Sequence, residues 1–267
     1  MRSTSPVSPR PRRARVAAAS VLLGLTVGLG ACTIGEGDDD EGGDSPTTPG
    51  TSVAGSAEPD GSADAESPPP PADVEQLVLT AEDAPDAGLQ PVPADEITGG
   101  MDALGAFTSD VRVEPQQCAD IGQDGMNAQA EPGAMAIQAG QVGETSIAVA
   151  VTRVTDGLPG RAQQIEDCPV MTVAFPLRGE EMVTETQNSL LDLDAPEGVE
   201  HFAAVVQDNS MDMMGQSIRT SNVMITGVVR GLGISVTAAG TGGPVPDEGR
   251  DAAVELFAAQ VEKVRSA

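Results

Sequence analysis

Residues 217–239 read SIRTSNVMITGVVRGLGISVTAA, and this stretch decides the fold class. Its middle part, Val223–Val229, is almost entirely apolar on both faces of a strand, which is typical of a strand at the centre of a sheet. The run Arg230-Gly231-Leu232-Gly233 is a short turn. The stretch therefore predicts a β-hairpin made of residues 217–230 and 232–239, with the first strand buried in the middle of the sheet.

Five further segments carry strand patterns. The clearest is 145–154, where Ile147, Val149 and Val151 alternate with other residues and would share one face. Residues 134–140 are the expected partner of that strand. Shorter apolar or alternating runs complete the set at 171–175, 182–191 and 201–208.

Two helices are expected to pack on these strands, one at about 160–168 and one at 247–265. Acidic residues at the start of the second helix and basic residues at its end suit the helix dipole. The side chains expected on the buried face of that helix are Val254, Phe257, Val261 and Val264. The sequence therefore predicts an α+β fold, with an antiparallel sheet of about five to seven strands and packed helices that include a C-terminal amphipathic helix.

Two shorter helical segments are expected before the strands. Thr80, with Asp83 three residues later, resembles a capping pattern that would start a short helix. Pro115 is suited to the first turn of another short helix over 115–121.

The N-terminal residues have the three zones of an export signal. Arginines dominate the first fifteen residues, an apolar stretch follows at 16–29, and small residues lead into a cysteine. The apolar stretch is shorter than the about 20 residues that a transmembrane helix needs. Leu29-Gly30-Ala31-Cys32 matches the lipobox of bacterial lipoproteins, in which the cysteine receives a diacylglyceryl group and becomes the new N-terminus. We therefore expect residues 1–31 to be a signal peptide and a lipid on Cys32 to hold the protein at the extracytoplasmic face of the cell membrane. An ordinary secretory signal with a chance cysteine is the alternative.

Residues 32–73 are expected to form a disordered tether. They consist mainly of Gly, Ser, Pro, Thr, Ala and acidic residues, with too few apolar side chains to form a core. The acidic run at 37–41 fits a solvated linker better than a cation site, because no fixed geometry would hold its carboxylates. Residues 74–267 are expected to form a single sensor-like domain.

The chain is strongly acidic, with 14 Lys and Arg against 41 Asp and Glu and a formal net charge of −27. Removal of residues 1–31 would take away five arginines and bring the charge to −32. Such a chain repels nucleic acid and anionic lipid head groups. We therefore expect no nucleic-acid partner, and contact with the membrane through the lipid on Cys32 alone.

Lipidation of Cys32 would leave two cysteines, Cys118 and Cys168. In an oxidising compartment two cysteines of one exported domain usually pair. We expect a disulfide between them that pins two helical segments together and reinforces a core with no Trp, no Tyr and four Phe. A redox-active pair is the alternative, although the two residues lack the Cys-x-x-Cys spacing of such pairs.

Four stretches carry a resemblance to a known family: LVLTAED at 77–83, VEPQQCA at 113–119, IEDCP at 165–169 and GVVRGLGISV at 227–236. From about Val74 to Ala267 the chain resembles the actinobacterial sensor-domain lipoproteins, which are related to the extracellular domain of PknH-type kinases. The resemblance implies a curved antiparallel sheet with helices, a cleft that binds a ligand, and no catalysis. The kinase domain has two disulfides and this chain can form one, so no ligand-contacting residue is carried over.

No group of residues in the sequence predicts a reaction. His201 is the only histidine, and no Gly-x-Ser-x-Gly nucleophile motif accompanies it. The acidic segments 192–198 and 208–212 lack the glycine and glutamate of calcium loops. Residues 211–214 could offer thioethers to Cu(I), but methionines elsewhere in the chain indicate a gap-filling role. We therefore expect no catalytic, metal-binding or cofactor-binding residue.

Three functions are compatible with these observations. The first is a membrane-anchored, non-enzymatic ligand-binding or sensor-like domain, with a small molecule or an envelope component as its partner. The second is a carrier of an apolar envelope lipid, because many small and aliphatic residues could line a cavity. The third is a cell-envelope hydrolase that uses a carboxylate pair, which the spacing of the acidic residues does not exclude.

Overall fold

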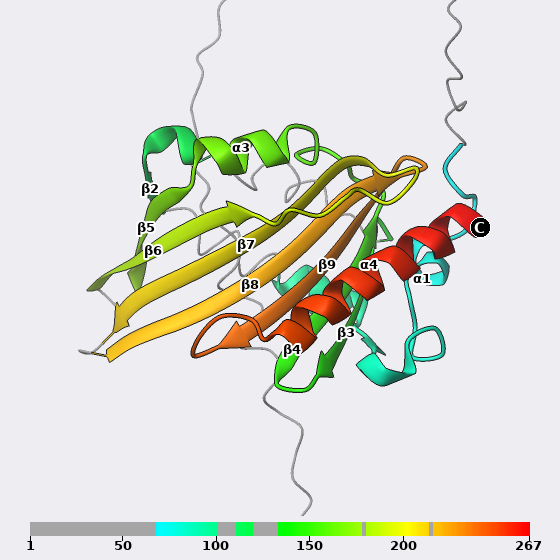
Figure 1. Ribbon diagram of the computed structural model, residues 1–267, viewed down its shortest axis with the longest axis horizontal. Coiled ribbons are helices and arrows are strands. Elements are labelled where there is room, and N and C mark those ends of the chain that lie inside the picture. The colour runs from blue at the N-terminus through cyan, green and yellow to red at the C-terminus, as the bar shows by residue number, and fades with distance from the viewer. Residues whose placement is uncertain (1–67, 101–110, 120–132, 178–179, 214–215) are drawn as a thin grey trace, which may run out of the picture.

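A computed structural model describes residues 68–100, 111–119, 133–177, 180–213 and 216–267. In this part of the chain nine strands form one antiparallel sheet in the order β1-β3-β4-β9-β8-β7-β6-β5-β2 (Figure 1). The strands are β1 (Gln90–Pro91), β2 (Arg112–Glu114), β3 (Met135–Val142), β4 (Thr145–Thr152), β5 (Val170–Leu177), β6 (Glu180–Leu190), β7 (Glu200–Met213), β8 (Gln216–Val229) and β9 (Leu232–Thr241). The helical elements are α1 (Val74–Leu77), the 3-10 helices η1 (Pro85–Ala87) and η2 (Gln116–Cys118), a helix that includes 94–100, α3 (Arg161–Asp167) and α4 (Asp247–Ser266).

The α+β class, the antiparallel sheet and the C-terminal helix agree with the sequence-based expectation, but the expected number of strands was too low. The seven predicted strands correspond to β3 through β9. The two additional strands, β1 and β2, have two and three residues and lie at opposite edges of the sheet. Strands this short show no alternation that a sequence pattern could reveal.

The β8–β9 hairpin lies at the centre of the sheet, as its apolar sequence predicts. β8 is the fifth of the nine strands in the described sheet, and Val229 pairs with Leu232 across the turn. The two turn residues, Arg230 and Gly231, have φ angles of 49° and 71°. Positive φ at both central residues is the type I′ geometry, whose twist matches that of the flanking strands.

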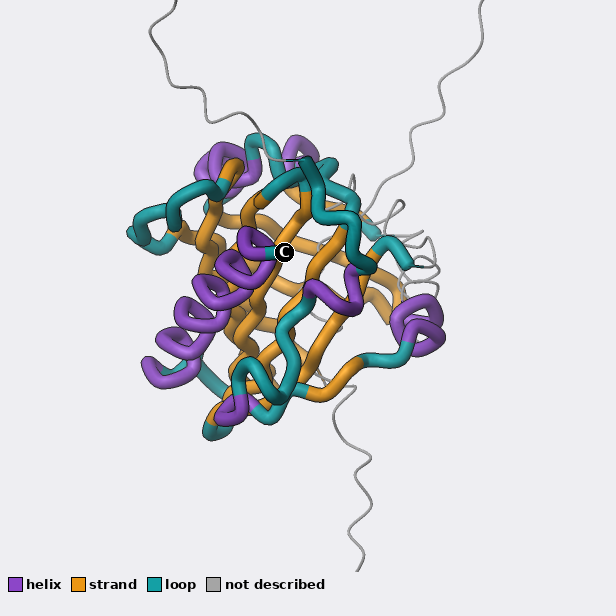
Figure 2. The backbone as a smooth tube through the Cα atoms, turned by 90° about the vertical axis from the view of Figure 1, so that its right-hand side faces the viewer, coloured by secondary structure: helices purple, strands orange, loops and turns teal. Residues whose placement is uncertain are grey.

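Helix α4 covers one face of the sheet, which we call the α4 face. Figure 2 shows the strands as one curved layer with α4 lying across it. The core between them contains Ile147 and Val149 of β4, Val236 of β9, and Phe257 and Val261 of α4, all buried. Strand residues and helix residues that are far apart in sequence therefore share one hydrophobic core.

Three of the four side chains predicted for the buried face of α4 are buried, and the structure adds Gly249, Ala253, Leu256 and Gln260 to that face. Phe257, Val261 and Val264 are buried as expected, but Val254 is 38% exposed. Ala253 takes the place of Val254 in the core and is fully buried. Consecutive residues of a helix are about 100° apart around its axis, so Ala253 can face the sheet while Val254 faces solvent. The small side chain of Ala253 lets the helix lie close to the sheet.

The N-terminal described segment lies beside the C-terminal end of α4 (Figure 1). Arg230 connects the two, because its Nε donates to the backbone oxygen of Pro68 at 3.1 Å and its Nη1 to that of Val264 at 3.2 Å. Pro70 is buried and α1 begins at Val74. The part of the chain that the structure describes contains no helix long and apolar enough to cross a membrane.

Two short predicted helices differ in the structure. No helix begins at Thr80; instead its backbone nitrogen and Oγ1 both donate to Asp83 Oδ2, at 2.8 and 2.9 Å, and close a turn. The segment after Pro115 forms η2, a single 3-10 turn. The predicted signal peptide, Cys32 and most of the predicted tether lie outside the described residues.

Candidate functional site

The second face of the sheet, which we call the α3 face, carries α3 and η2. Directly paired residues of an antiparallel sheet point to the same side. The register therefore places Asn188 of β6, Gln207 of β7, Asn222 of β8, Ala239 of β9 and Ser146 of β4 in one row across this face. Three neighbouring strands thus present side-chain amides, and the next two present an alanine and a serine.

Charged residues are distributed unequally between the two faces. Along the whole of β3, β4, β8 and β9, on β6 from Met182 and on β7 from Ala203, no position on the α3 face holds an ionisable residue. The acidic chain therefore has a broad neutral surface within its described sheet. The α4 face instead carries Arg112, Glu114, Glu181, Glu185, Asp208, Asp212 and Arg219, all of them exposed.

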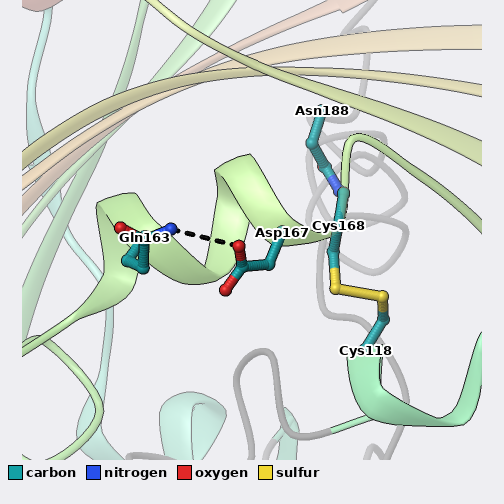
Figure 3. The surroundings of a disulfide bond; sticks show 5 residues. All are labelled: Cys118, Gln163, Asp167, Cys168 and Asn188. Carbon is teal, nitrogen blue, oxygen red and sulfur yellow. Dashed lines mark hydrogen bonds between the residues drawn. A yellow bond between two sulfur atoms is a disulfide. The ribbon is translucent and has the colours of Figure 1, made fainter.

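A disulfide fixes one end of the α3 face. Cys118 of η2 and Cys168, the residue after α3, are bonded, with 5.8 Å between their Cα atoms (Figure 3). Both cysteines are buried beside Ile165 of α3, in a second core cluster that includes Met171 of β5 and Val205 of β7. The disulfide joins the two helical segments, as the sequence analysis expected, and holds them on strands β5 to β7.

Hydrogen bonds connect the disulfide loop to the amide row. Asn188 Nδ2 donates to the backbone oxygen of Cys168 at 2.9 Å, and Gln207 Nε2 donates to Asn188 Oδ1 at 3.0 Å. Asn188 lies beside Cys168 in Figure 3. Because Asn188 is buried and bonded on both sides, its side chain has a fixed position and in turn orients Gln207.

The neighbouring row holds polar atoms without partners. Thr186 Oγ1 and Asn209 Oδ1 are 2.8 Å apart and share a hydrogen bond. Asn209 Nδ2 and the Oγ1 of Thr220, its partner on β8, are buried and have no hydrogen-bond partner among the described residues. Buried polar groups of this kind are uncommon in proteins, since each one left without a partner costs about 1–3 kcal/mol.

The middle of the α3 face is half-buried and is formed by small side chains. Ala150 of β4 and Ser235 and Thr237 of β9 surround Met224 of β8 there, together with Ala239. Small residues on two adjacent strands leave the backbone of the sheet close to whatever lies over it.

One cation lies over this neutral surface. Arg161 is the first residue of α3, and its Nη2 is 3.9 Å from the sulfur of Met224. Its Nε is buried and has no hydrogen-bond partner, and the residue forms no ion pair with another described residue. Desolvation by burial lowers the pKa of the Arg161 guanidinium from its ordinary value, although an arginine remains charged at any physiological pH.

Of the other residues weighed in the sequence, His201 and residues 192–198 lie away from this surface, whereas Asn209 and Met211 of β7 point to it. His201 is exposed in the bulge at the start of β7, with a φ of 52°. Residues 192–198 form a connection between β6 and β7 outside the sheet. Among the described residues, no group of three or more His, Cys, Asp or Glu side chains could hold a metal ion.

Arg161 and the amide row were not predicted from the sequence. No motif marks these residues, because they come from four different elements. The sequence did carry one signal, which was the alternation within each strand. In 134–140, 145–154 and 217–239, all the strand residues that point to the α3 face are uncharged.

No family model matches the chain, and no curated protein matches it. A solved structure that matches is that of an uncharacterized protein from Mycobacterium smegmatis, the Rv0999 ortholog. The two chains are 16% identical, with a TM-score of 0.39, over 73% of this chain and 98% of the other. A likeness of this degree assigns neither a family nor a function.

Proposed function

We propose that the protein is an extracytoplasmic lipoprotein, anchored by a lipid on Cys32, whose domain binds a ligand on the α3 face without catalysing a reaction. In this proposal residues 1–31 are a signal peptide, residues 32–73 are a tether and residues 74–267 are the binding domain. The lipobox and the resemblance to actinobacterial sensor-domain lipoproteins support the anchor and the binding role.

The composition of the α3 face is the main support for the binding role. It combines half-buried small residues, a row of oriented amides and buried polar atoms without partners. Binding sites typically present a mainly uncharged surface with a few well-positioned polar groups. A ligand that supplied the missing partners would also remove the cost of leaving Asn209 and Thr220 unsatisfied.

The anchor is tested by replacing Cys32. We expect the protein expressed in an actinobacterial host to enter the detergent phase on phase separation, and Cys32→Ala to move it to the aqueous phase. Cys168→Ala is the matched control, since it removes a different cysteine and should leave the protein in the detergent phase. Membrane retention of the Cys32→Ala protein would contradict the anchor.

The binding site is tested by capture from an envelope extract. The full-length protein, purified in mild detergent, is exposed to the extract and analysed by native mass spectrometry. We expect an adduct that is lost in the double variant Gln207→Leu, Asn222→Leu, because both amides would no longer form hydrogen bonds. Gln187→Leu is the matched control, because Gln187 is an exposed amide on the opposite face of β6. An adduct retained by the double variant would contradict the placement of the site.

The same spectra separate the alternative functions. A carrier of an apolar lipid would yield an adduct with the mass of a lipid, and loss of the two amides would not remove this adduct. A hydrolase would yield a product rather than an adduct, and its activity would depend on a carboxylate pair. The uncharged strand positions of the α3 face favour binding over hydrolysis, because the described strands offer no such pair there.

A further inference from the structure

Arg161 is unlike the other cations of the described chain. Those in contact with carboxylates or backbone oxygens are Arg112, Arg153, Arg230, Arg250, Lys263 and Arg265. Arg219 is exposed to water on the α4 face. Arg161 is the one whose Nε is buried without a partner, and the only described contact of its guanidinium is the weak acceptor Met224 Sδ.

This arrangement is unfavourable for the protein by itself. A charge removed from water is usually compensated by a counter-charge or by several hydrogen bonds. The chain has nearly three acidic residues for each basic one, yet none of the described acids pairs with Arg161. The acids of the described strands lie mainly on the α4 face, so the α3 face leaves the guanidinium uncompensated.

We propose that Arg161 binds the oxyanion group, a carboxylate or a phosphate monoester, of a ligand whose remaining body is uncharged. The body lies over the half-buried Met224 and its row neighbour Thr237, next to the amide of Asn222. This inference rests on the proposed function, because it names the ligand class for the same face.

The surroundings of Arg161 set the other properties of this ligand. Guanidinium groups bind oxyanions through two parallel hydrogen bonds, so one terminal oxyanion suffices. No second cation lies on the described α3 face, which disfavours a polyanion. The neutral strand positions offer small apolar side chains and neutral hydrogen-bonding groups, which match an aliphatic or hydroxylated body rather than a second charge.

The test uses three probes with the same six-carbon chain: hexanoate, hexyl phosphate and hexan-1-ol. The full-length protein in non-ionic detergent is titrated while the arginine Nε–Hε signals are followed by NMR. The signal that disappears in Arg161→Gln identifies Arg161. We expect hexanoate or hexyl phosphate to shift that signal with saturation, and the one that binds more tightly indicates which oxyanion the site prefers.

The variants separate a specific site from general charge attraction. Arg161→Gln should weaken binding of the preferred anion by about tenfold or more, since a charge-assisted hydrogen bond is lost. Arg219→Gln removes the same charge from the opposite face of β8 and should leave binding unchanged. Arg161→Lys should restore part of the affinity.

Three results would overturn the inference. They are equal binding of hexan-1-ol and the anions, equal loss of affinity in Arg161→Gln and Arg219→Gln, and no saturable shift with either anion. If α3-face amide signals such as Asn222 shift with hexan-1-ol while Arg161 does not respond, the inference fails and the proposed binding face stands. If the envelope adduct is also absent, both fail.

Discussion

Gln260 of α4 and Leu77 of α1 are 183 positions apart and are joined by a hydrogen bond of 2.7 Å from Gln260 Nε2 to the backbone oxygen of Leu77. Gln260 Oε1 also accepts a hydrogen bond from the backbone nitrogen of Leu79 at 2.8 Å. The glutamine is completely buried. One side chain therefore satisfies a donor and an acceptor of the N-terminal segment and fixes that segment against the C-terminal helix.

Replacement of this glutamine by an apolar residue of similar size should be strongly destabilising. Gln260→Leu leaves two buried backbone groups without partners, so we expect the free energy of unfolding to fall by about 2–4 kcal/mol. Gln163→Leu, an exposed glutamine of α3, should change it by less than about 0.5 kcal/mol. Urea denaturation measures both values, and equal effects of the two variants would show that Gln260 does not have this role.

Replacement of Gly249 by alanine should destabilise the protein, although alanine usually stabilises a helix relative to glycine. Alanine normally stabilises a helix interior by about 1 kcal/mol relative to glycine. A Cβ at position 249 would lie 2.4 Å from Oγ1 and 2.7 Å from Cγ2 of the buried Thr145 of β4. We expect Gly249→Ala to lower the free energy of unfolding by about 1–3 kcal/mol.

A second substitution tests the cause of that loss. Thr145→Ala removes two of the three contacting side-chain atoms and keeps only the Cβ, so the double variant should recover part of the stability that Gly249→Ala loses. Stabilisation by Gly249→Ala alone, measured by thermal or urea unfolding, would mean that α4 is not packed this closely on β4.

The disulfide should contribute strongly to the stability of the α3 face. Cys118 and Cys168 are separated by 50 positions, and closing a loop of this length stabilises by about 4 kcal/mol in the chain-entropy model. We expect Cys118→Ser, Cys168→Ser to lower the free energy of unfolding by about that amount. Hydrogen exchange should also increase in η2 and α3 more than in α4, because α4 belongs to the other core cluster. Uniform acceleration throughout the domain would contradict this division.

The Asp83–Lys263 ion pair should make stability depend on acid pH. Lys263 Nζ lies 2.7 Å from Asp83 Oδ2, and this hydrogen bond, with those from Thr80, lowers the pKa of Asp83 below its ordinary value of 3.8. Because the folded-state pKa is the lower one, the stabilisation is present above the ordinary pKa and is lost as the pH falls through the folded-state value. The pair is partly exposed, so its contribution is at most about 1 kcal/mol.

The measurement compares unfolding free energies of Asp83→Asn and the unchanged protein from about pH 6 to about pH 2. The difference between the two should shrink as the pH falls. Asp86→Asn is the control, since Asp86 is exposed and forms no ion pair with another described residue. A difference that stays constant over the whole range would argue against the ion pair.

Long periodic segments made much of the fold predictable from the sequence. The β8–β9 hairpin has an apolar centre and a two-residue turn, and α4 has an amphipathic pattern with suitably charged ends, so local physics determines both. The edge strands β1 and β2 were not predictable, because two or three residues carry no period and their pairing depends on partners elsewhere in the chain.

The candidate site was not predictable for a related reason. Asn188, Gln207 and Asn222 form a row only when the register of β6, β7 and β8 is known, and a shift by one residue would turn them to the other face. The isolation of Arg161 depends on which carboxylates lie near it, which is a property of the tertiary structure. The Cys118–Cys168 pair was predictable because the sequence leaves only two cysteines after Cys32.

The most direct test of the binding face compares methyl groups that alternate along the same strands. Ala148 and Ala239 lie on the α3 face, whereas Ile147 and Ala238 lie on the α4 face beside them. Methyl NMR spectra of the full-length protein are recorded with and without the envelope fraction that yields the adduct. The account predicts shifts of the Ala148 and Ala239 signals with Ile147 and Ala238 unchanged. Shifts confined to Ile147 and Ala238 would contradict it.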